Sequence, residues 1–588
     1  MNILSSNNEK LNIKLRIAAL VVLIILVSWP ALFMDMAKGH DLNFHLMRIE
    51  GIMSDASWRN LPVRMQSKWV DGYGYPVSVL YGDLFLYIPA VFRKLGLPIM
   101  TAYRLFVLCI NSATVIIGYN SFKAFYKGWP AVAATWLYTT AAYRLVDEYV
   151  RSAVGETLAI TFFPAVAACI YCILTIEDHK KAWKYTAILA LAFTAVICSH
   201  TLTTSMMLVV LAPCTIVCIF LFVKKKDRLI RFWQIVSAGL ITLLLAGFFL
   251  LPFMDFYLNA DIGFAIDKSV NIQGLGLVPA DLFDFFENPF NTRSGDIQKT
   301  PGLALMAALV AAAVYIIVSL RKKGRSDDRR RIVFYFTVSV ILLFMTSRFF
   351  PWDFIEHNIP FGGIFVAIEF PMRYLAFAIL FMAILAGDLL NMLDIKAADR
   401  ANAKLRTTVV CMYVLVAFLG VANVAHLAVC NHSWEKKAHF MKEEDLGRWD
   451  YYAMDFQLNN STVNDLDPGI KTEGMLNFEL LSRSSNDFMM ACVTDQDFGW
   501  VQLPVFAYPY YYAEVVDDPS VSLEMHEGAN RTVGVLLPGN FSGILHVYWK
   551  EPVLWRICDL ISLLTAMVCI AFIAYTEYQS RAKKGKNE

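Results

Sequence analysis

The chain has 588 residues, of which 57% are hydrophobic and only 17% are charged, whereas roughly 25% of an ordinary soluble domain is charged. Such a composition argues strongly against a soluble enzyme of this length. The formal net charge of +2 gives no bulk basicity that would indicate a nucleic-acid partner. The 11 cysteines lie mostly inside apolar stretches without metal-ligand spacing, so neither a disulfide scaffold nor a zinc module is expected.

About twelve stretches are long and apolar enough to cross a bilayer, whose core needs roughly 20 apolar residues in a helix. The first is too long for the core of a signal peptide, and we interpret it as an uncleaved anchor. The sequence therefore predicts an all-α polytopic membrane bundle. The expected spans are residues 15–34, 102–121, 130–146, 157–176, 185–200, 203–223, 232–253, 301–320, 332–350, 371–392, 407–429 and 553–576.

The distribution of lysine and arginine predicts the orientation of this bundle. If the N-terminus is cytoplasmic, every basic loop falls on the cytoplasmic side, from Lys10 and Lys14 before the first span to the tail at 581–586. The long segments 35–101 and 431–552 then face the other side. We expect a multi-pass membrane protein with both termini in the cytoplasm and its chemistry on the other face, which in a bacterial plasma membrane is extracytoplasmic.

Two of the outer segments are long enough to carry structure of their own. Segment 35–101 is rich in tyrosine and tryptophan and contains an apolar stretch, 84–95, that is too short to span, so interfacial helices are expected there. The latter half of 431–552 alternates polar and apolar residues around a turn at 538–540, which predicts β-strands. The predicted parts are a transmembrane module at 1–430, a small β-rich extracytoplasmic domain at 431–552, and a last helix with a basic tail at 553–588.

The first outer segment opens with a carboxylate, an imidazole and a guanidinium at helical spacing. If this region is helical, Asp41, His45 and Arg48 share one face next to the membrane. A solvated helix face with Asp41 as the N-cap explains the pattern equally well.

The turn at 143–156 holds three acids and two arginines between two spans. Charges so close to hydrocarbon are costly unless they are paired or line a wet cavity. A structural Arg–Glu pair is the preferred interpretation for Asp147 and Glu148, whereas Arg151 and Glu156 are also candidates for binding a substrate.

Two further polar residues lie at the same predicted face. His200 lies at the outer turn between the fifth and sixth expected spans, where a histidine is more often a hydrogen-bonded interface residue than a catalyst. Arg373 enters a span from outside and needs an anion, either Glu369 or a ligand phosphate, which the planar guanidinium suits. The acids at 255, 261, 281, 284 and 287 are interpreted as ordinary loop residues.

Together these features resemble the GT-C superfamily of membrane glycosyltransferases, which use sugars carried on polyprenyl phosphates. The resemblance lies in Asp41 just after the first span, the long outer loop with the motif 81–87, the Tyr103-Arg104-Leu105 span entry and the acidic turn. Residues 41–100 also resemble membrane proteins labelled "6-pyruvoyl-tetrahydropterin synthase-related". Residues 360–380 and 500–576 are similar to the YfhO group.

The resemblance implies an inverting glycosyltransferase with Asp41 as the general base. Its donor would be a polyprenyl-phosphate-linked sugar, bound by His45, Arg48, Arg151, Glu156, His200 and Arg373. The acceptor would be a hydroxyl of a cell-surface polymer or glycolipid. No Asp-x-Asp pair is present at 41, where Asn43 takes the second place, so the sequence does not favour a metal-dependent scheme and leaves a divalent metal open, with no other cofactor expected.

Two other classes of function fit the sequence as well. Twelve spans around charged residues suit a lipid or polysaccharide transporter, although transporters often place ionisable groups near the midplane. A non-catalytic envelope assembly factor that presents segment 431–552 is the other alternative. The enzyme interpretation requires Asp41, the turn at 147–156 and Arg373 to converge on one outer site.

Overall fold

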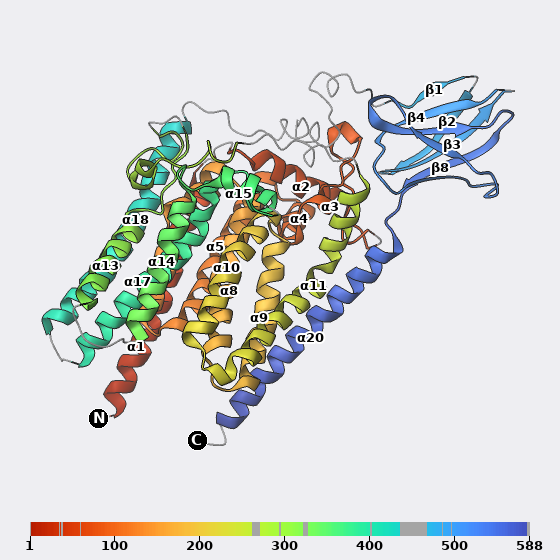
Figure 1. Cartoon of the computed structure of the whole chain (residues 1–588). Helices are drawn as coiled ribbons and strands as arrows, with labels where there is room; N and C mark the ends of the chain where they lie inside the picture. The colour runs from red at the N-terminus through yellow and green to blue at the C-terminus, as the bar shows by residue number, and fades with distance from the viewer. Residues whose placement is uncertain are drawn as a thin grey trace.

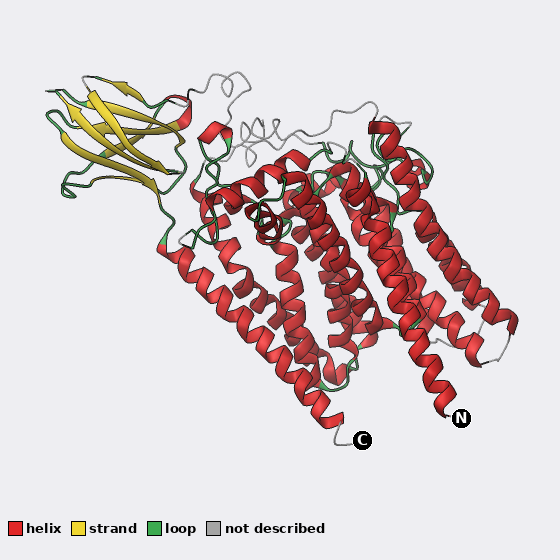
Figure 2. Ribbon diagram, turned by 180° about the vertical axis from the view of Figure 1, so that it is seen from behind, coloured by secondary structure: helices red, strands yellow, loops and turns green. Residues whose placement is uncertain are grey.

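The protein is a bundle of long helices with a small β domain before the last helix, as the apolar stretches and the alternating segment of the sequence predict (Figure 1). The computed structural model describes residues 2–584 except 35, 37–38, 59, 261–270, 293–295, 321–326, 361, 400–402, 436–466, 468, 475, 485 and 496. Both termini lie at one end of the bundle and the β domain lies at the other end, in the view from behind as well (Figure 2).

Nine helices of the described residues are long and apolar enough to span a membrane. The chain is therefore an integral membrane protein. These helices are α1 (Asn2–Phe33), α5 (Ile99–Phe125), α8 (Val154–Thr175), α10 (Thr201–Phe222), α11 (Arg228–Asn259), α13 (Leu303–Leu320), α17 (Leu375–Asp399), α18 (Ala403–Glu435) and α20 (Val553–Lys584).

Three further helices occupy the remaining expected spans: α6 (Trp129–Thr139), α9 (His179–Ile197) and α14 (Asp327–Met345). α9 and α14 carry several charges at one end, and α6 ends at Thr139 before the short α7 (Ala142–Val146), so none of the three has an uncharged apolar stretch as long as a full span. α9 and α14 nevertheless run beside the other long helices (Figure 1). Because both termini lie at one end, the number of crossings must be even, which twelve satisfies and nine does not.

Short helices cover the end of the bundle opposite the termini. They are α2 (Leu42–Asp55), α3 (Val77–Leu80), α4 (Tyr87–Lys94), α15 (Trp352–Asn358) and α16 (Gly362–Val366). α4 lies in the stretch where a surface helix is expected and packs on α2, and its Arg93 pairs with Glu50. α2 is almost entirely buried, so its polar residues do not form a solvated face.

The β domain is a sandwich of two four-stranded antiparallel sheets, in the orders β1-β4-β7-β6 and β2-β3-β8-β5. Alternating apolar residues of both sheets fill the space between them. The predicted turn at 538–540 joins β7 to β8 and carries the chain from one sheet to the other. The strands are β1 (Lys471–Glu473), β2 (Leu476–Ser484), β3 (Asp487–Thr494), β4 (Gly499–Phe506), β5 (Tyr511–Val515), β6 (Glu524–Glu527), β7 (Thr532–Leu537) and β8 (Ser542–Trp549).

Aromatic residues of the sandwich and of the helices pack together where the β domain meets the bundle. One carboxylate links three chain segments at this contact. Asp255, near the end of α11, accepts hydrogen bonds of 2.7 Å from Tyr510 before β5 and from Trp555 at the start of α20. Its interpretation as an ordinary loop residue was wrong, because a carboxylate four residues before the end of a span can reach the segment that packs over it. Of the same group of acids, Asp261 lies outside the described residues.

Candidate active site

Asp41 occupies the N-cap position of α2 without using its side chain as a cap. Its backbone N–H donates to the carbonyl of Arg151 at 2.9 Å, and its own carbonyl accepts from His45 at 3.1 Å. The carboxylate is half-buried and makes no hydrogen bond within the described part of the chain. Burial raises the pKa of Asp41 above its ordinary value, although the cations of Arg151 and Arg373 act in the opposite direction.

The loop before Asp41 approaches the second outer turn closely enough to require a glycine. Gly39 has a φ of +45°, and a Cβ added there would lie 2.5 Å from the hydroxyl oxygen of Ser152. Ser152 is itself left-handed, with a φ of +56°, and it ends a π-helical turn at Asp147–Arg151. These two backbone features bring Asp41 against Arg151.

The π-helical turn directs Arg151 toward two acids. Its Nη1 lies 2.5 Å from Asp147 Oδ1 and 2.8 Å from Glu156 Oε2 in the first turn of α8. All three side chains are almost fully buried. Burial, and then the neighbouring Glu156 carboxylate, raise the pKa of Asp147 well above its ordinary value. Arg151 and Glu156 therefore form the charged centre of this turn.

Arg373 approaches the same carboxylate from α17. Its Nε lies 3.3 Å from Glu156 Oε2, and its Nη2 lies 2.9 Å from Glu369. Glu369 has a 53% exposed side chain and a left-handed φ of +57°, whereas Arg373 is buried. The Tyr143 hydroxyl donates a 2.7 Å hydrogen bond to Oε1, the other carboxylate oxygen of Glu156. Two arginines that are far apart in sequence thus share one buried carboxylate.

His200 lies beside this group, where it is buried and hydrogen-bonded. It is buried at the N-cap of α10, where Nδ1 accepts a 3.2 Å hydrogen bond from the Thr203 N–H. Burial, reinforced by the Arg373 cation, lowers the pKa of His200 to about 3. The neutral ring therefore carries its proton on Nε2.

His45 and Arg48 are buried on α2 and make local contacts. Arg48 Nη1 lies 3.3 Å from His45 Nδ1, and Nη2 donates to the carbonyl oxygens of Tyr81 at 3.1 Å and Gly82 at 2.7 Å. The guanidinium also stacks on the Tyr81 ring at 4.3 Å. That ring lies 5.6 Å from the ring of His200, so Tyr81 connects α2 to the group around Glu156.

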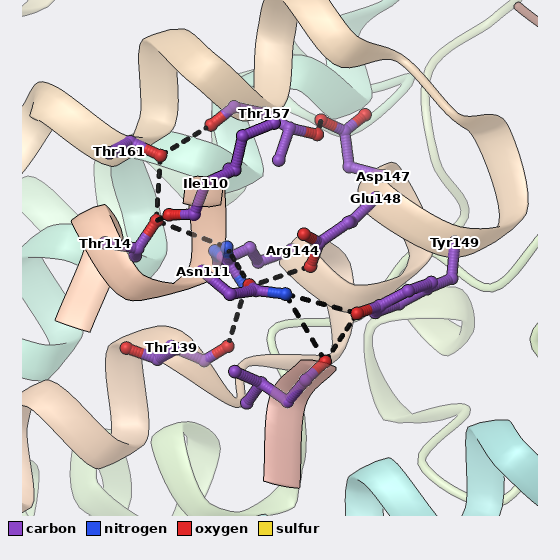
Figure 3. Close-up of polar contacts among 11 residues, drawn as sticks. Ile110, Asn111, Thr114, Thr139, Arg144, Asp147, Glu148, Tyr149, Thr157 and Thr161 are labelled. Carbon is purple, nitrogen blue, oxygen red and sulfur yellow. Dashed lines mark hydrogen bonds and ion pairs between the residues drawn. The ribbon is translucent and has the colours of Figure 1, made fainter. Parts of the chain in front are cut away.

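A second buried network lies beneath the π-helical turn (Figure 3). Arg144 pairs with Glu148 at 3.2 Å and donates to Asn111 of α5 at 2.8 Å. Burial raises the pKa of Glu148 to about 7, although Arg144 lowers it. Thr157 adds a 3.1 Å hydrogen bond to Asp147, so the turn is supported on both sides. The preference for a structural pair at Glu148 agrees with these contacts.

The structure thus brings Asp41, Arg151, Glu156 and Arg373 together, places His200 beside them, and puts His45 and Arg48 one aromatic ring away. Sequence reasoning missed Tyr143 and Tyr81. Both lie in apolar surroundings where tyrosine is common, although Tyr81 belongs to a motif that the sequence marks. Among the described residues, no three His, Cys, Asp or Glu side chains are grouped as metal ligands. A cavity of about 610 Å³ lies elsewhere, among α6, α17 and α18.

The chemistry open to this group combines a base with an anion site. A carboxylate with a raised pKa accepts a proton more readily than an ordinary aspartate. Two arginines beside it, fixed by buried partners, stabilise negative charge without reorganisation. The site can therefore activate a hydroxyl and support an anionic leaving group.

No protein-family model matches the chain. No curated protein matches it either. Among solved structures, it is similar to the oligosaccharyltransferase AglB of Archaeoglobus fulgidus, in complex with an inhibitory peptide and a dolichol-phosphate. The identity is 14% and the TM-score 0.42, over 73% of this chain and 56% of that one. The chain thus spans about half the length of the archaeal protein.

Two other solved structures are similar to a comparable degree. The arabinofuranosyltransferase AftD from Mycobacteria has 14% identity and a TM-score of 0.38, over 71% of this chain and 26% of that one. ArnT from Cupriavidus metallidurans, bound to undecaprenyl phosphate, has 12% identity and a TM-score of 0.38, over 88% of this chain and 97% of that one. Likenesses at this level carry no argument about function, which rests on the site itself.

Proposed function

We propose that the protein is a GT-C-type membrane glycosyltransferase. It moves a sugar from a polyprenyl-phosphate donor to a hydroxyl of a cell-surface polymer or glycolipid, with inversion at the anomeric carbon. One observation carries this proposal. The backbone of Asp41, whose side chain does not cap α2, is hydrogen-bonded to Arg151, and Arg151 and Arg373 both pair with the Glu156 carboxylate. A base and two cations thus meet at one end of the bundle.

In the proposed reaction, Asp41 is the general base. The acceptor hydroxyl gives its proton to the Asp41 carboxylate as its oxygen bonds to the anomeric carbon. The bond from that carbon to the phosphate oxygen breaks, and the electron pair leaves with the lipid phosphate. The half-buried position and raised pKa of Asp41 suit this role.

The leaving phosphate needs cations more than it needs a proton. Arg373 is the proposed phosphate ligand, with Arg151 beside it, because a guanidinium donates two parallel hydrogen bonds to a phosphate. Arg373 is already paired with Glu156 and Glu369, and only Glu369 is exposed. The donor phosphate therefore takes the place of Glu369, while Glu156 keeps both arginines oriented.

The remaining residues of the site orient the donor. The Nε2–H of neutral His200 donates to a donor oxygen without adding charge. His45 and Arg48 hold the aromatic wall at Tyr81 in place. The site lies at the end of the bundle away from both termini, which fits an extracytoplasmic active site in a bacterial plasma membrane with cytoplasmic termini.

The test begins with mass spectrometry of surface polymers and glycolipids from cells with and without the gene, which identifies the missing sugar. The deletion strain is then complemented with the wild type, Asp41→Asn or the control Asp353→Asn, an exposed acid of α15. We expect the wild type and the control to restore the sugar. Asp41→Asn loses about 10²–10⁴-fold in rate, the usual contribution of a general base. Full restoration by Asp41→Asn contradicts the proposal.

A further inference from the structure

One outer face of the β sandwich carries a row of aromatic rings. Tyr512 of β5 lies directly opposite Tyr548 of β8, with ring centroids 5.9 Å apart and planes tilted by only 28°. The side chain of Tyr512 is 45% exposed although it lies within a strand. The exposed Tyr512 and the partly buried Tyr548, nearly parallel on neighbouring strands, form a flat apolar surface that the sandwich core does not use.

A histidine extends this surface and is held by two acids. The His546 ring lies 4.4 Å from the Tyr548 ring with a tilt of 30°. Its Nε2 lies 2.9 Å from Asp487 of β3, and its Nδ1 lies 3.1 Å from Glu514 of β5. The ring is therefore held between β3 and β5 by these two contacts before any partner binds. We name Tyr512, Tyr548 and His546 the aromatic platform.

The aromatic platform has the chemistry that recognises a sugar ring. A pyranose presents polarised C–H bonds on its faces, which pack against the electron-rich face of an aromatic ring. Its edge carries hydroxyls, which donate hydrogen bonds to carboxylates such as Asp487 and Glu514 beside the platform. Fixed rings also lose little conformational entropy on binding.

The charges around the aromatic platform restrict the kind of glycan. Two carboxylates flank it, and both are about half exposed. Arg483 on the neighbouring strand β2 is directed elsewhere, donating at 3.0 Å to the carbonyl of Gly72 and lying over the Phe488 ring. A polymer rich in phosphate or uronate would be repelled here, whereas a neutral or amino-bearing sugar would not.

We propose that the aromatic platform binds a neutral or amino sugar of the acceptor glycan and thereby delivers the acceptor to the enzyme. This inference rests on the proposed function, because it takes the acceptor to be a glycan. The β domain lies at the same end of the bundle as the candidate active site, so a chain held there is on the correct side of the membrane (Figure 2).

The experiment measures binding by the full-length protein in detergent, with no donor present. The probes are the hexasaccharides of cellulose, xylan and chitin, with poly(glycerol phosphate) as the anionic probe. We expect at least one neutral or amino-sugar probe to bind and the anionic probe not to bind. The double variant Tyr512→Ala/Tyr548→Ala should weaken binding about tenfold or more, as for other aromatic contact residues. Tyr512→Phe, which keeps the ring, should retain it.

The matched control is Phe498→Ala, an exposed aromatic outside the aromatic platform. Circular dichroism melting shows whether each variant is folded. The inference is overturned if none of the sugars binds, if the folded double variant binds like the wild type, or if poly(glycerol phosphate) binds best. Self-association that the double variant abolishes, without sugar binding, also overturns it. Normal sugar transfer with no probe binding rejects only this inference, whereas probe binding without transfer rejects only the proposed function.

Discussion

Asp41 shows how a single side chain is left available for chemistry. An aspartate at an N-cap position ordinarily accepts a hydrogen bond from the first turn of the helix. Here the backbone of Asp41 is held by Arg151 instead, and its carboxylate does not act as a cap. The sequence pattern left an N-cap and a general base equally open, because the two differ only in the orientation of one side chain.

The pH dependence of sugar transfer tests the state of this carboxylate. Because burial raises the pKa of Asp41 above 3.8, the rate should fall with decreasing pH before an ordinary aspartate would protonate. His200, with a pKa of about 3, stays neutral throughout that range. The acid limb of kcat/KM should therefore persist in His200→Gln. An acid limb that disappears in this variant would assign the titration to the histidine.

Glu369 provides a second test at the scale of one residue. It is the exposed anion on Arg373, and in the proposed reaction the donor phosphate replaces it. Glu369→Gln removes that competition, so the KM for the lipid donor should fall about two- to tenfold, as expected for a charge interaction of about 1 kcal/mol. The control is Glu356→Gln on α15, which should change nothing. A raised KM in Glu369→Gln would mean that Glu369 contributes to binding.

Among the elements, the π-helical turn at Asp147–Arg151 owes its position to the network beneath it (Figure 3). The sequence marks this turn because its charges lie beside hydrocarbon. It could not reveal the partners, since Asn111 and Thr114 lie within the span of α5, 30 or more residues before Arg144. Only the packing of α5 against α8 brings them together.

Arg144→Leu tests this support. The substitution leaves the buried Glu148 without its cation, which costs about 3–5 kcal/mol for a buried pair. Thermal unfolding in detergent should show a large loss, and Arg144→Leu/Glu148→Leu should recover much of it, since the unpaired charge is gone. Arg330→Leu removes an exposed pair and should cost at most about 1 kcal/mol. Equal melting of Arg144→Leu and Arg330→Leu would show that the network supports nothing.

The sequence predicted the elements well where hydrophobicity alone decides them. The spans, the surface helix at 87–94 and strands β7 and β8 all follow from periodicity and length. The break within the expected span 130–146 was missed, because residues 140–141 contain neither glycine nor proline. The attachment of the β sandwich through Asp255 was also missed, because it depends on contacts between residues about 250–300 positions apart.

At the scale of the whole molecule, the position of both termini and of the β domain fixes the relative sidedness of every segment (Figure 1). A cysteine introduced at Asp518 in the β domain should react with a membrane-impermeant maleimide in intact cells. A cysteine at Lys225, between α10 and α11, should react only after lysis. The wild type, with its 11 native cysteines, gives the background. The reverse pattern would place Asp41 in the cytosol and exclude the proposed reaction.

The pairing of the buried arginines has a consequence for biosynthesis. Arg144, Arg151 and Arg373 each have a carboxylate four residues away in the sequence, at Glu148, Asp147 and Glu369. Each cation therefore emerges from the ribosome together with its own counter-charge. Insertion of these segments moves nearly neutral pairs toward lipid, which is far less costly than moving a lone guanidinium. The ion pair between Arg373 and Glu156 forms only after the segment that leads into α17 has been synthesised. Before that, each of these arginines already has a nearby carboxylate of its own.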